Sequence, residues 1–375
     1  MVKLTSRERI MRIFKNQEID RPSLKLWGAT MGLQMMHPDY QQIQDMAMEL
    51  TDIYDGFGCS IEPICGANRH LWETEIFDTD NPLWKDHRTT LHTPMGDLYQ
   101  IARISTIGEP GYTIRYMVQD EEDLEKLLSV PYEPTHFTAF DAFEVRKAQL
   151  GERGVVMLGL PHAGYALQMR TGSENLAYFS VDCREMVDEA ISRYAQRILD
   201  YVKEILAAGV TGPFSWVGPE LLIPPLLTPD DFMDFCYKYD KPICDAIHDA
   251  GGYVWVHCHG KVAKLLDAFI DMGVDILNPL EPPKNGDVDL ASDVRKFGNR
   301  IGWEGNIEIQ EILLAPKERL RQLIYECVQA GAPSGRFILC PSAGYMEYPR
   351  PTAHYIENLK EYMRYGHACV EACRK

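Results

Sequence analysis

The stretch "GGYVWVHCHGK" (residues 251–261) contains the signals that decide the fold of this chain. Its two glycines follow a helical pattern and precede residues 253–256, an apolar run rich in β-prone side chains. Glycine is common just past a helix end, and aromatic and β-branched residues favour strands. The run ends in His257, Cys258 and His259, which are all potential metal ligands. The order of helix, short buried strand and polar strand end predicts one unit of an α/β protein.

Seven further runs of the same kind flank this one along the chain. Helical patterns separate most of them, for example residues 182–208, 229–250, 261–272 and 316–330, where apolar residues recur at three- and four-residue spacing. Eight strands alternating with helices predict a (β/α)8 TIM barrel, with a doubly wound open sheet as the structural rival. The eight expected strands are "SLKLWG" (23–28), "CSIEPI" (59–64), "GVVMLGLP" (154–161), "TGPFSWVG" (211–218), "YVWVHC" (253–258), "DILNPLE" (275–281), "RIGWEGN" (300–306) and "RFILCPS" (336–342).

Residues 84–118 interrupt the alternation. The stretches "RTTLHTPMGDLYQIARIS" (88–105) and "GYTIRYMV" (111–118) have the turn and strand signals of antiparallel pairs. We therefore expect an inserted β-hairpin over one barrel mouth, acting either as a structural excursion or as a lid or docking surface. Because no repeat, low-complexity tract or long linker appears, we expect residues 1–375 to form a single domain.

Composition excludes several classes of protein. The 375 residues are 45% hydrophobic and 25% charged, which is ordinary for a soluble globular protein. The net charge of −17 and the lack of a basic stripe argue against a nucleic-acid partner, and no apolar stretch has membrane-spanning length. The polar amphipathic start is unlike a signal peptide. The ten cysteines form no CxxC motif and no disulfide framework, which indicates a reducing cytoplasm.

Polar and aromatic side chains recur at one predicted pole. In TIM barrels the chemistry lies at the carboxyl ends of the strands and in the loops that follow them. Each such residue alone is explained by the polarity of loops, but their concentration after eight strands predicts a site. The candidates are Trp27, Glu62, His162, Trp216, Glu220, His257, His259, Glu281, Glu304, Asn306, Cys340 and Tyr345.

The H-x-H pair suggests a metal. Strand side chains alternate, so His257 and His259 are expected to point one way and Cys258 the other. Two neutral imidazoles with a carboxylate or a thiolate would form an open catalytic zinc site. Glu220 and Cys340 are both candidates for that third ligand. The alternative is a pair of structural histidines held by hydrogen bonds.

Four segments resemble the uroporphyrinogen decarboxylase superfamily, and the likeness runs over nearly the whole chain. The superfamily has a (β/α)8 barrel with its site at the carboxyl-terminal mouth, and it contains the heme-pathway decarboxylase as well as zinc-dependent, corrinoid-linked methyltransferases. The segments are "SRERIMRIFKNQEIDRPSLKLWG" (6–28), "GGYVWVHCHGKVAKLLDAFIDMGVDILNPLE" (251–281), "GWEGNI" (302–307) and "FILCPSAGYMEYPRPTAHYIENLKEYMRYG" (337–366).

Two departures separate the chain from the porphyrinogen decarboxylases. Those enzymes carry an arginine-rich RQAGR segment after the first strand, whereas "LWGATMGLQMMHPDY" (26–40) contains no arginine. A substrate with eight carboxylates needs cations in its site. In addition, "DGFGCSIEP" (55–63) places Glu62 where the family's catalytic aspartate would fall. Both differences favour the methyltransferase branch.

That branch uses an H-x-C motif on strand five and a distal cysteine on strand eight as zinc ligands. Here His257 matches the histidine, His259 stands at the cysteine position, and Cys340 lies three residues before the place of the distal cysteine. The resemblance therefore implies a variant zinc site built from His257, His259 and either Glu220 or Cys340. With fewer thiolates the ion is a harder Lewis acid, which suits a methoxylated rather than a thiol substrate.

The resemblance implies a methyltransferase that moves a methyl group between a small, for example methoxylated aromatic, substrate and a corrinoid. The chain lacks a D-x-H-x-x-G corrinoid motif, so a separate corrinoid protein is expected as partner; the sequence allows a homo-oligomer. A decarboxylase acting on another substrate and a non-catalytic binding protein stay open. The expected catalytic carboxylates are Glu62, Glu220 and Glu304, and the expected substrate or cofactor contacts are Trp27, His162, Trp216, Glu281, Asn306 and Tyr345.

Overall fold

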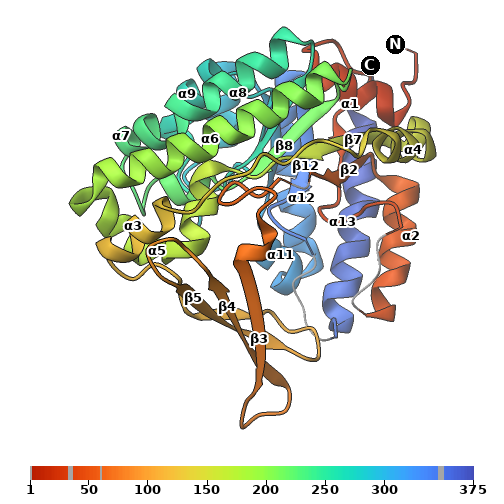
Figure 1. Cartoon of the computed structure of the whole chain (residues 1–375). Helices are drawn as coiled ribbons and strands as arrows, with labels where there is room; N and C mark the ends of the chain where they lie inside the picture. Colours follow the sequence, from red (N-terminus) through yellow and green to blue (C-terminus); the bar gives the residue numbers. More distant parts are fainter. Residues whose placement is uncertain (1, 33–36, 60, 345–349) are drawn as a thin grey trace.

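Eight parallel strands surrounded by helices form the body of the protein (Figure 1). The computed structural model describes residues 2–32, 37–59, 61–344 and 350–375. Neighbouring strands follow the order β1-β12-β11-β10-β9-β8-β7-β2, so the predicted (β/α)8 barrel is confirmed. The strands are β1 (Ser23–Leu24), β2 (Ile53–Gly58), β7 (Gly154–Gly159), β8 (Pro213–Val217), β9 (Tyr253–His257), β10 (Ile276–Asn278), β11 (Gly302–Ile307) and β12 (Phe337–Pro341).

Helices separate the barrel strands along the chain and cover the outside of the sheet. Within the described residues, none of them combines the length and the apolar character that crossing a membrane requires. The helices are α1 (Ser6–Phe14), α2 (Gln41–Leu50), α3 (Glu121–Leu128), α4 (Phe140–Leu150), α5 (Ala163–Asp182), α6 (Arg184–Ala207), α7 (Pro229–Phe232), α8 (Lys238–Asp249), α9 (Leu266–Met272), α10 (Leu290–Phe297), α11 (Ile309–Leu314), α12 (Lys317–Gly331) and α13 (Ala353–Ala372).

The second strand lies six residues before its predicted position. The sequence pattern favours residues 59–64, but the strand is β2, Ile53–Gly58. Its sequence "IYDGFG" contains an aspartate and two glycines, which are all depleted in strands. The ladder with β7 and the pairing of buried Asp55 with Arg146 override that propensity. The prediction was wrong because local composition does not report these long-range partners.

The inserted segment is a complete antiparallel sheet rather than one hairpin. Its order is β3-β4-β5-β6, and it projects from the barrel on the side away from the chain termini (Figure 1). The sheet begins at Trp72, twelve residues before the predicted start, because the acidic residues of its first strand face solvent and hide the strand pattern. The bounds are β3 (Trp72–Asp78), β4 (Trp84–Leu91), β5 (Leu98–Ser105) and β6 (Tyr112–Arg115).

Helix α1 covers one end of the barrel interior. Its first turn is fixed by a capping box, in which Glu8 N donates to Thr5 Oγ1 at 3.1 Å and Thr5 N donates to Glu8 Oε2 at 2.8 Å. Ile10, Ile13 and Phe14 are buried in one apolar cluster with inward-facing barrel residues. The opposite end, where the strands have their carboxyl ends, is therefore the end at which a ligand site can open.

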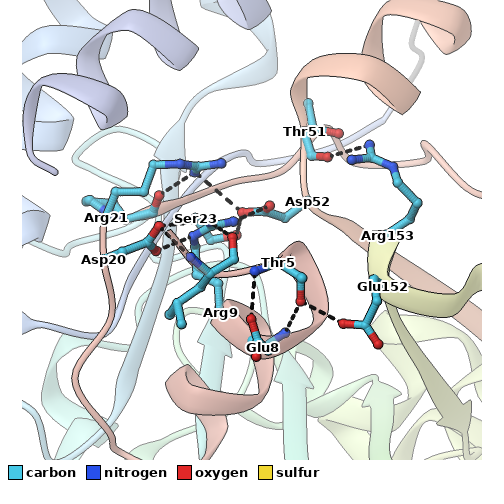
Figure 2. Close-up of polar contacts among 12 residues, drawn as sticks. Thr5, Glu8, Arg9, Asp20, Arg21, Ser23, Thr51, Asp52, Glu152 and Arg153 are labelled. Carbon is cyan, nitrogen blue, oxygen red and sulfur yellow. Dashed lines mark hydrogen bonds and ion pairs between the residues drawn. The ribbon is translucent and has the colours of Figure 1, made fainter. Parts of the chain in front are cut away.

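A buried ionic network joins α1 to both ends of the barrel sheet (Figure 2). Arg9 donates from Nε to Asp20 Oδ1 at 2.8 Å and from Nη1 to Asp52 Oδ1 at 2.7 Å. Burial would raise the pKa of Asp20, but the hydrogen bond and the charge of Arg9 lower it to about 2. Asp52 also accepts from Ser23 Oγ at 2.8 Å, and Asp52 N donates to Leu24 O at 2.8 Å. These bonds tie β1 to the start of β2, where the sheet closes.

Replacing Arg9 should destabilise the protein severely. An Arg9→Met variant leaves the carboxylates of Asp20 and Asp52 buried with incomplete pairing, so we expect a loss of about 3 kcal/mol in the free energy of unfolding. Urea unfolding followed by circular dichroism measures the change. The matched control is Arg7→Ala, because Arg7 is 48% exposed and lies 3.7 Å from Glu152; it should change stability by no more than about 0.5 kcal/mol. Equal losses in the two variants would contradict the role of the network.

Candidate functional site

Three polar side chains stand on neighbouring strands inside the barrel. His257 ends β9, Asn278 ends β10, and their backbones are paired in the parallel register. Glu304 lies on the next strand, β11. The three residues are buried, with Asn278 and Glu304 fully enclosed. The fold therefore brings together residues that are 47 positions apart in the sequence, at the end of the barrel that the sequence predicts for the site.

A continuous hydrogen-bonded chain connects these residues to a buried lysine. Lys25 Nζ lies 2.6 Å from Glu304 Oε1, and Asn278 Nδ2 donates to the same oxygen at 3.0 Å. Trp255 Nε1 donates to Glu304 Oε2 at 2.7 Å. Asn278 Oδ1 lies 2.6 Å from His257 Nδ1. We call the first three members the Lys25–Glu304–Asn278 chain. Lys25 was missed by sequence analysis; its only signal is a charge within the apolar run "SLKLW".

His257 is held as a neutral imidazole. Burial is the main cause that lowers its pKa, to about 4, and the charge of His259 acts in the same direction. Trp27, which the sequence predicts as a substrate or cofactor contact, stacks on the imidazole with ring centroids 4.8 Å apart. Asn278 Oδ1 accepts from Nδ1–H, so the lone pair of His257 is on Nε2. Among the described residues, no hydrogen bond is made to that nitrogen.

His259 forms the second half of the site. Its Nδ1 lies 2.8 Å from Glu281 Oε1, and Gly260 N donates to Glu281 Oε2 at 2.9 Å. Burial would lower the pKa of His259, but the hydrogen bond and charge of Glu281 raise it above its ordinary value. The His257 and His259 rings have centroids 4.5 Å apart and are nearly perpendicular. Both imidazoles thus have Nδ1 bound to an oxygen, which is the usual state of histidines that bind metals through Nε2.

Carboxylates gather around this pair. Glu220 and Glu308 both add to the negative charge acting on His259. Glu220 Oε2 accepts from Gly218 N at 2.9 Å. Glu308 follows β11 directly and was not predicted, because the expected strand ended at Asn306. Among the described residues, its Oε1 is buried without a hydrogen-bond partner. Burial raises the pKa of Glu308.

Cys340 and Glu304 are both fully buried in the barrel, close enough for the charge of Glu304 to act on the thiol. Cys340 is fully buried on β12, and both burial and the charge of Glu304 raise the pKa of its thiol. In the described part of the chain, its sulfur does not form a group of ligand atoms within 4.8 Å together with His257 and His259. Glu304, expected to be catalytic, is fully buried among Lys25, Trp255 and Asn278, so it would act through these neighbours.

None of the described contacts joins the other predicted residues to the two histidines. Trp216 packs in the core between the sheet and the helices. Asn306 donates its backbone N–H to Cys327 Sγ and lines a cavity of about 730 Å³ that Glu308 also borders. Glu62 lies four residues after β2 and borders a cavity of about 400 Å³ with Arg69, Trp72 and Arg170, at the base of the inserted sheet. Tyr345 lies outside the described residues.

His162 belongs to a separate buried group with Cys236 and Asp240. The ligand atoms of these three residues lie within 4.8 Å of one another and could hold a metal ion. However, His162 Nδ1 caps α5 by accepting from Tyr165 N at 3.2 Å, which places its hydrogen on Nε2. That nitrogen lies 3.1 Å from Asp240 Oδ2. The hydrogen bonds therefore satisfy this group without an ion, and ligation through Nε2 would remove the cap.

Comparison with known proteins places the chain among barrels of one family. The family model described as uroporphyrinogen decarboxylase (URO-D) matches residues 108–368. A methyltransferase from Methanosarcina mazei has a similar structure, with a TM-score of 0.59, 13% sequence identity, and coverage of 96% of this chain and 99% of that chain. This likeness shows the shared fold. No functionally curated protein matches the sequence.

A second solved structure is more distant. D-psicose 3-epimerase from Clostridium cellulolyticum H10 gives a TM-score of 0.33 with 12% identity, and the match covers 64% of this chain and 84% of the epimerase. A similarity at this level carries no functional information.

The pKa values of the two candidate histidines should be shifted in opposite directions from the ordinary value. In metal-free protein, His257 should gain its proton only near pH 4, whereas His259 should do so above the ordinary value of 6.5. Nuclear magnetic resonance of protein with isotope-labelled histidine measures both transitions, with His257→Gln and His259→Gln variants to assign the signals. The ordinary histidine value of 6.5 serves as the reference. A midpoint for His257 close to that value would show that the buried hydrogen-bonded arrangement is not maintained in solution.

Proposed function

Because this chain belongs to the uroporphyrinogen decarboxylase family, we propose that it is a methyltransferase whose barrel mouth holds a zinc ion on His257 and His259. The methyl donor is a small methoxylated compound, and the acceptor is a corrinoid on a separate protein. One observation supports the proposal above the others. Both imidazoles have their Nδ1 atoms engaged by oxygen acceptors, and the rings lie edge to face at 4.5 Å.

The side chains present offer nitrogen and oxygen ligands of the kinds that bind zinc. His257 is neutral and offers Nε2, and the acidic surroundings of His259 favour a cation. Glu308, whose buried Oε1 has no hydrogen-bond partner among the described residues, is a better third ligand than either predicted candidate. Glu220 is bound to Gly218 N, and Cys340 lies deeper beside Glu304. In the described residues the three ligand atoms are not yet within 4.8 Å of one another, so binding would have to draw them together.

The side chains of this site have distinct tasks in methyl transfer. When bound, the ion supplies Lewis-acid stabilisation for the oxygen that loses the methyl group. Trp27 provides an apolar wall that holds His257 in place by stacking. Glu281 holds His259 by its hydrogen bond and compensates the positive charge of the site. Burial around His257 excludes water, which strengthens each of these electrostatic interactions.

Charge argues against the heme-pathway substrate. Lys25 is the cation nearest to His257 in the hydrogen-bonded chain, and it is buried and paired with Glu304. Glu220, Glu281 and Glu308 surround the histidines and would repel a ligand with eight carboxylates. The second candidate function is a decarboxylase acting on a smaller acid. The observation that favours it is the pair of arginines, Arg69 and Arg170, in the cavity beside Glu62.

Methyl transfer should require both histidines and a corrinoid partner. The purified protein should contain stoichiometric zinc and should form methylcobalamin, followed by absorbance, from a methoxylated donor when a reduced corrinoid protein is supplied. His257→Ala and His259→Ala should abolish both properties, since an open site with two protein ligands left binds poorly. His136→Ala changes an exposed histidine and should leave both unchanged. Conversion of uroporphyrinogen to coproporphyrinogen by the protein, or stoichiometric zinc retained by His257→Ala, would overturn the proposal.

A further inference from the structure

We infer that Glu304, acting with Lys25 through Asn278, is a positioning residue that selects which nitrogen of His257 carries the hydrogen. The inference rests on the proposed function only in its consequence for metal binding. Glu304 and Lys25 are both buried inside the barrel. Their effect reaches His257 through two successive hydrogen bonds, from Asn278 to Glu304 and from His257 to Asn278.

Lys25, Asn278 and Trp255 all approach Glu304 with hydrogen-bond donors. An ionised carboxylate only accepts hydrogen bonds. Oε1 is 2.6 Å from Lys25 Nζ and 3.0 Å from Asn278 Nδ2, and Oε2 accepts from Trp255 Nε1 at 2.7 Å. Lys25 in turn forms an ion pair with this carboxylate. Its ammonium lies over the Trp27, Tyr54 and Trp255 rings, 4.6–4.7 Å from each ring centroid, so aromatic faces surround it on the sides that Glu304 does not occupy.

The orientation of Asn278 follows from Glu304. The asparagine amide has one donor end and one acceptor end, and the carboxylate takes the donor end. The acceptor end, Oδ1, is then left 2.6 Å from His257 Nδ1. An acceptor at that distance requires a hydrogen on Nδ1. In a neutral imidazole the lone pair is then on Nε2, the nitrogen that a metal ion or an electrophile would meet.

Stability alone does not explain why the Lys25–Glu304 ion pair is buried. Replacing a buried ion pair by apolar side chains of similar volume is often neutral or stabilising, so burial of charge is weak evidence for a role in stability. Lys25 is at 5% exposure and Glu304 at 0%, and two successive hydrogen bonds connect Glu304 to His257. The carboxylate of Glu304 orients the Asn278 amide by accepting its hydrogen bond, which an apolar side chain could not do.

The decisive variant removes the charges but keeps the volume. In Lys25→Met/Glu304→Leu, Asn278 loses the acceptor that fixes its amide, so a second population of His257 with the hydrogen on Nε2 should appear. The native protein should show the Nδ1–H tautomer alone. Nitrogen chemical shifts of isotope-labelled histidine in metal-free protein at neutral pH report the tautomer directly. Asn278→Leu removes the acceptor for Nδ1–H itself and should give the same mixture.

Glu304→Gln is the matched control. Its amide oxygen can take the place of Oε1 and accept from both Lys25 and Asn278, so only the bond to Trp255 is lost and the His257 tautomer should stay as in the native protein. Zinc titration gives a second readout: affinity should fall about 10–100-fold in the double variant and in Asn278→Leu, as for other partners of metal-binding histidines. A single Nδ1–H tautomer in a folded double variant, or an Nε2–H tautomer in the native protein, overturns the inference. Failure of zinc binding or methyl transfer alone would refute the proposed function and leave the tautomer result standing.

Discussion

The buried contact of Arg9 with Asp20 and Asp52 is the constraint on which the rest of the barrel depends. Strand β1 contains only two residues, Ser23–Leu24, and it forms a ladder with β12. On its other side, no ladder with β2 is formed among the described residues, and a backbone bond runs from Asp52 N to Leu24 O. Such a short edge closes a barrel weakly. The guanidinium of Arg9 compensates by bridging carboxylates that flank β1 and β2 (Figure 2).

The position of β1 also determines where residues of the candidate site lie at the opposite end of the barrel. Lys25 follows β1 directly, and its backbone is fixed by bonds to Leu339 O and from Tyr362 Oη at 2.9 Å and 2.8 Å. Its side chain then begins the Lys25–Glu304–Asn278 chain, and Trp27, two residues later, stacks on His257. A shift of β1 would therefore move both the wall of the site and the group that orients its histidine. The contacts that close the barrel at β1 therefore also position the side chains of the candidate site.

Near the inserted sheet, a residue that follows a barrel strand has surroundings that the sequence pattern did not predict. Glu62 comes after a barrel strand, as His257 does, yet its carboxylate accepts hydrogen bonds from Ile64 N and Cys65 N and it borders a cavity under the sheet. Arg170 stacks on Trp72 in the same cavity. The region after β2 thus joins the insertion to the barrel. The candidate metal site lies instead around β9, β10 and β11, where no insertion intervenes.

The sequence by itself determined the class of fold and singled out His257 and His259 as a candidate pair. Periodic helices and short apolar runs are local signals, so the eight-unit barrel and an antiparallel insertion could be predicted. It could not place β2, because the Gly-containing strand is stabilised by partners far along the chain. Only the tertiary structure decided that Lys25 and Glu304, 279 residues apart, form an ion pair, and that Asn278 orients His257. The physical reason is that the charge and orientation of a buried polar group depend on its neighbours in space, and the sequence pattern reports only neighbours along the chain.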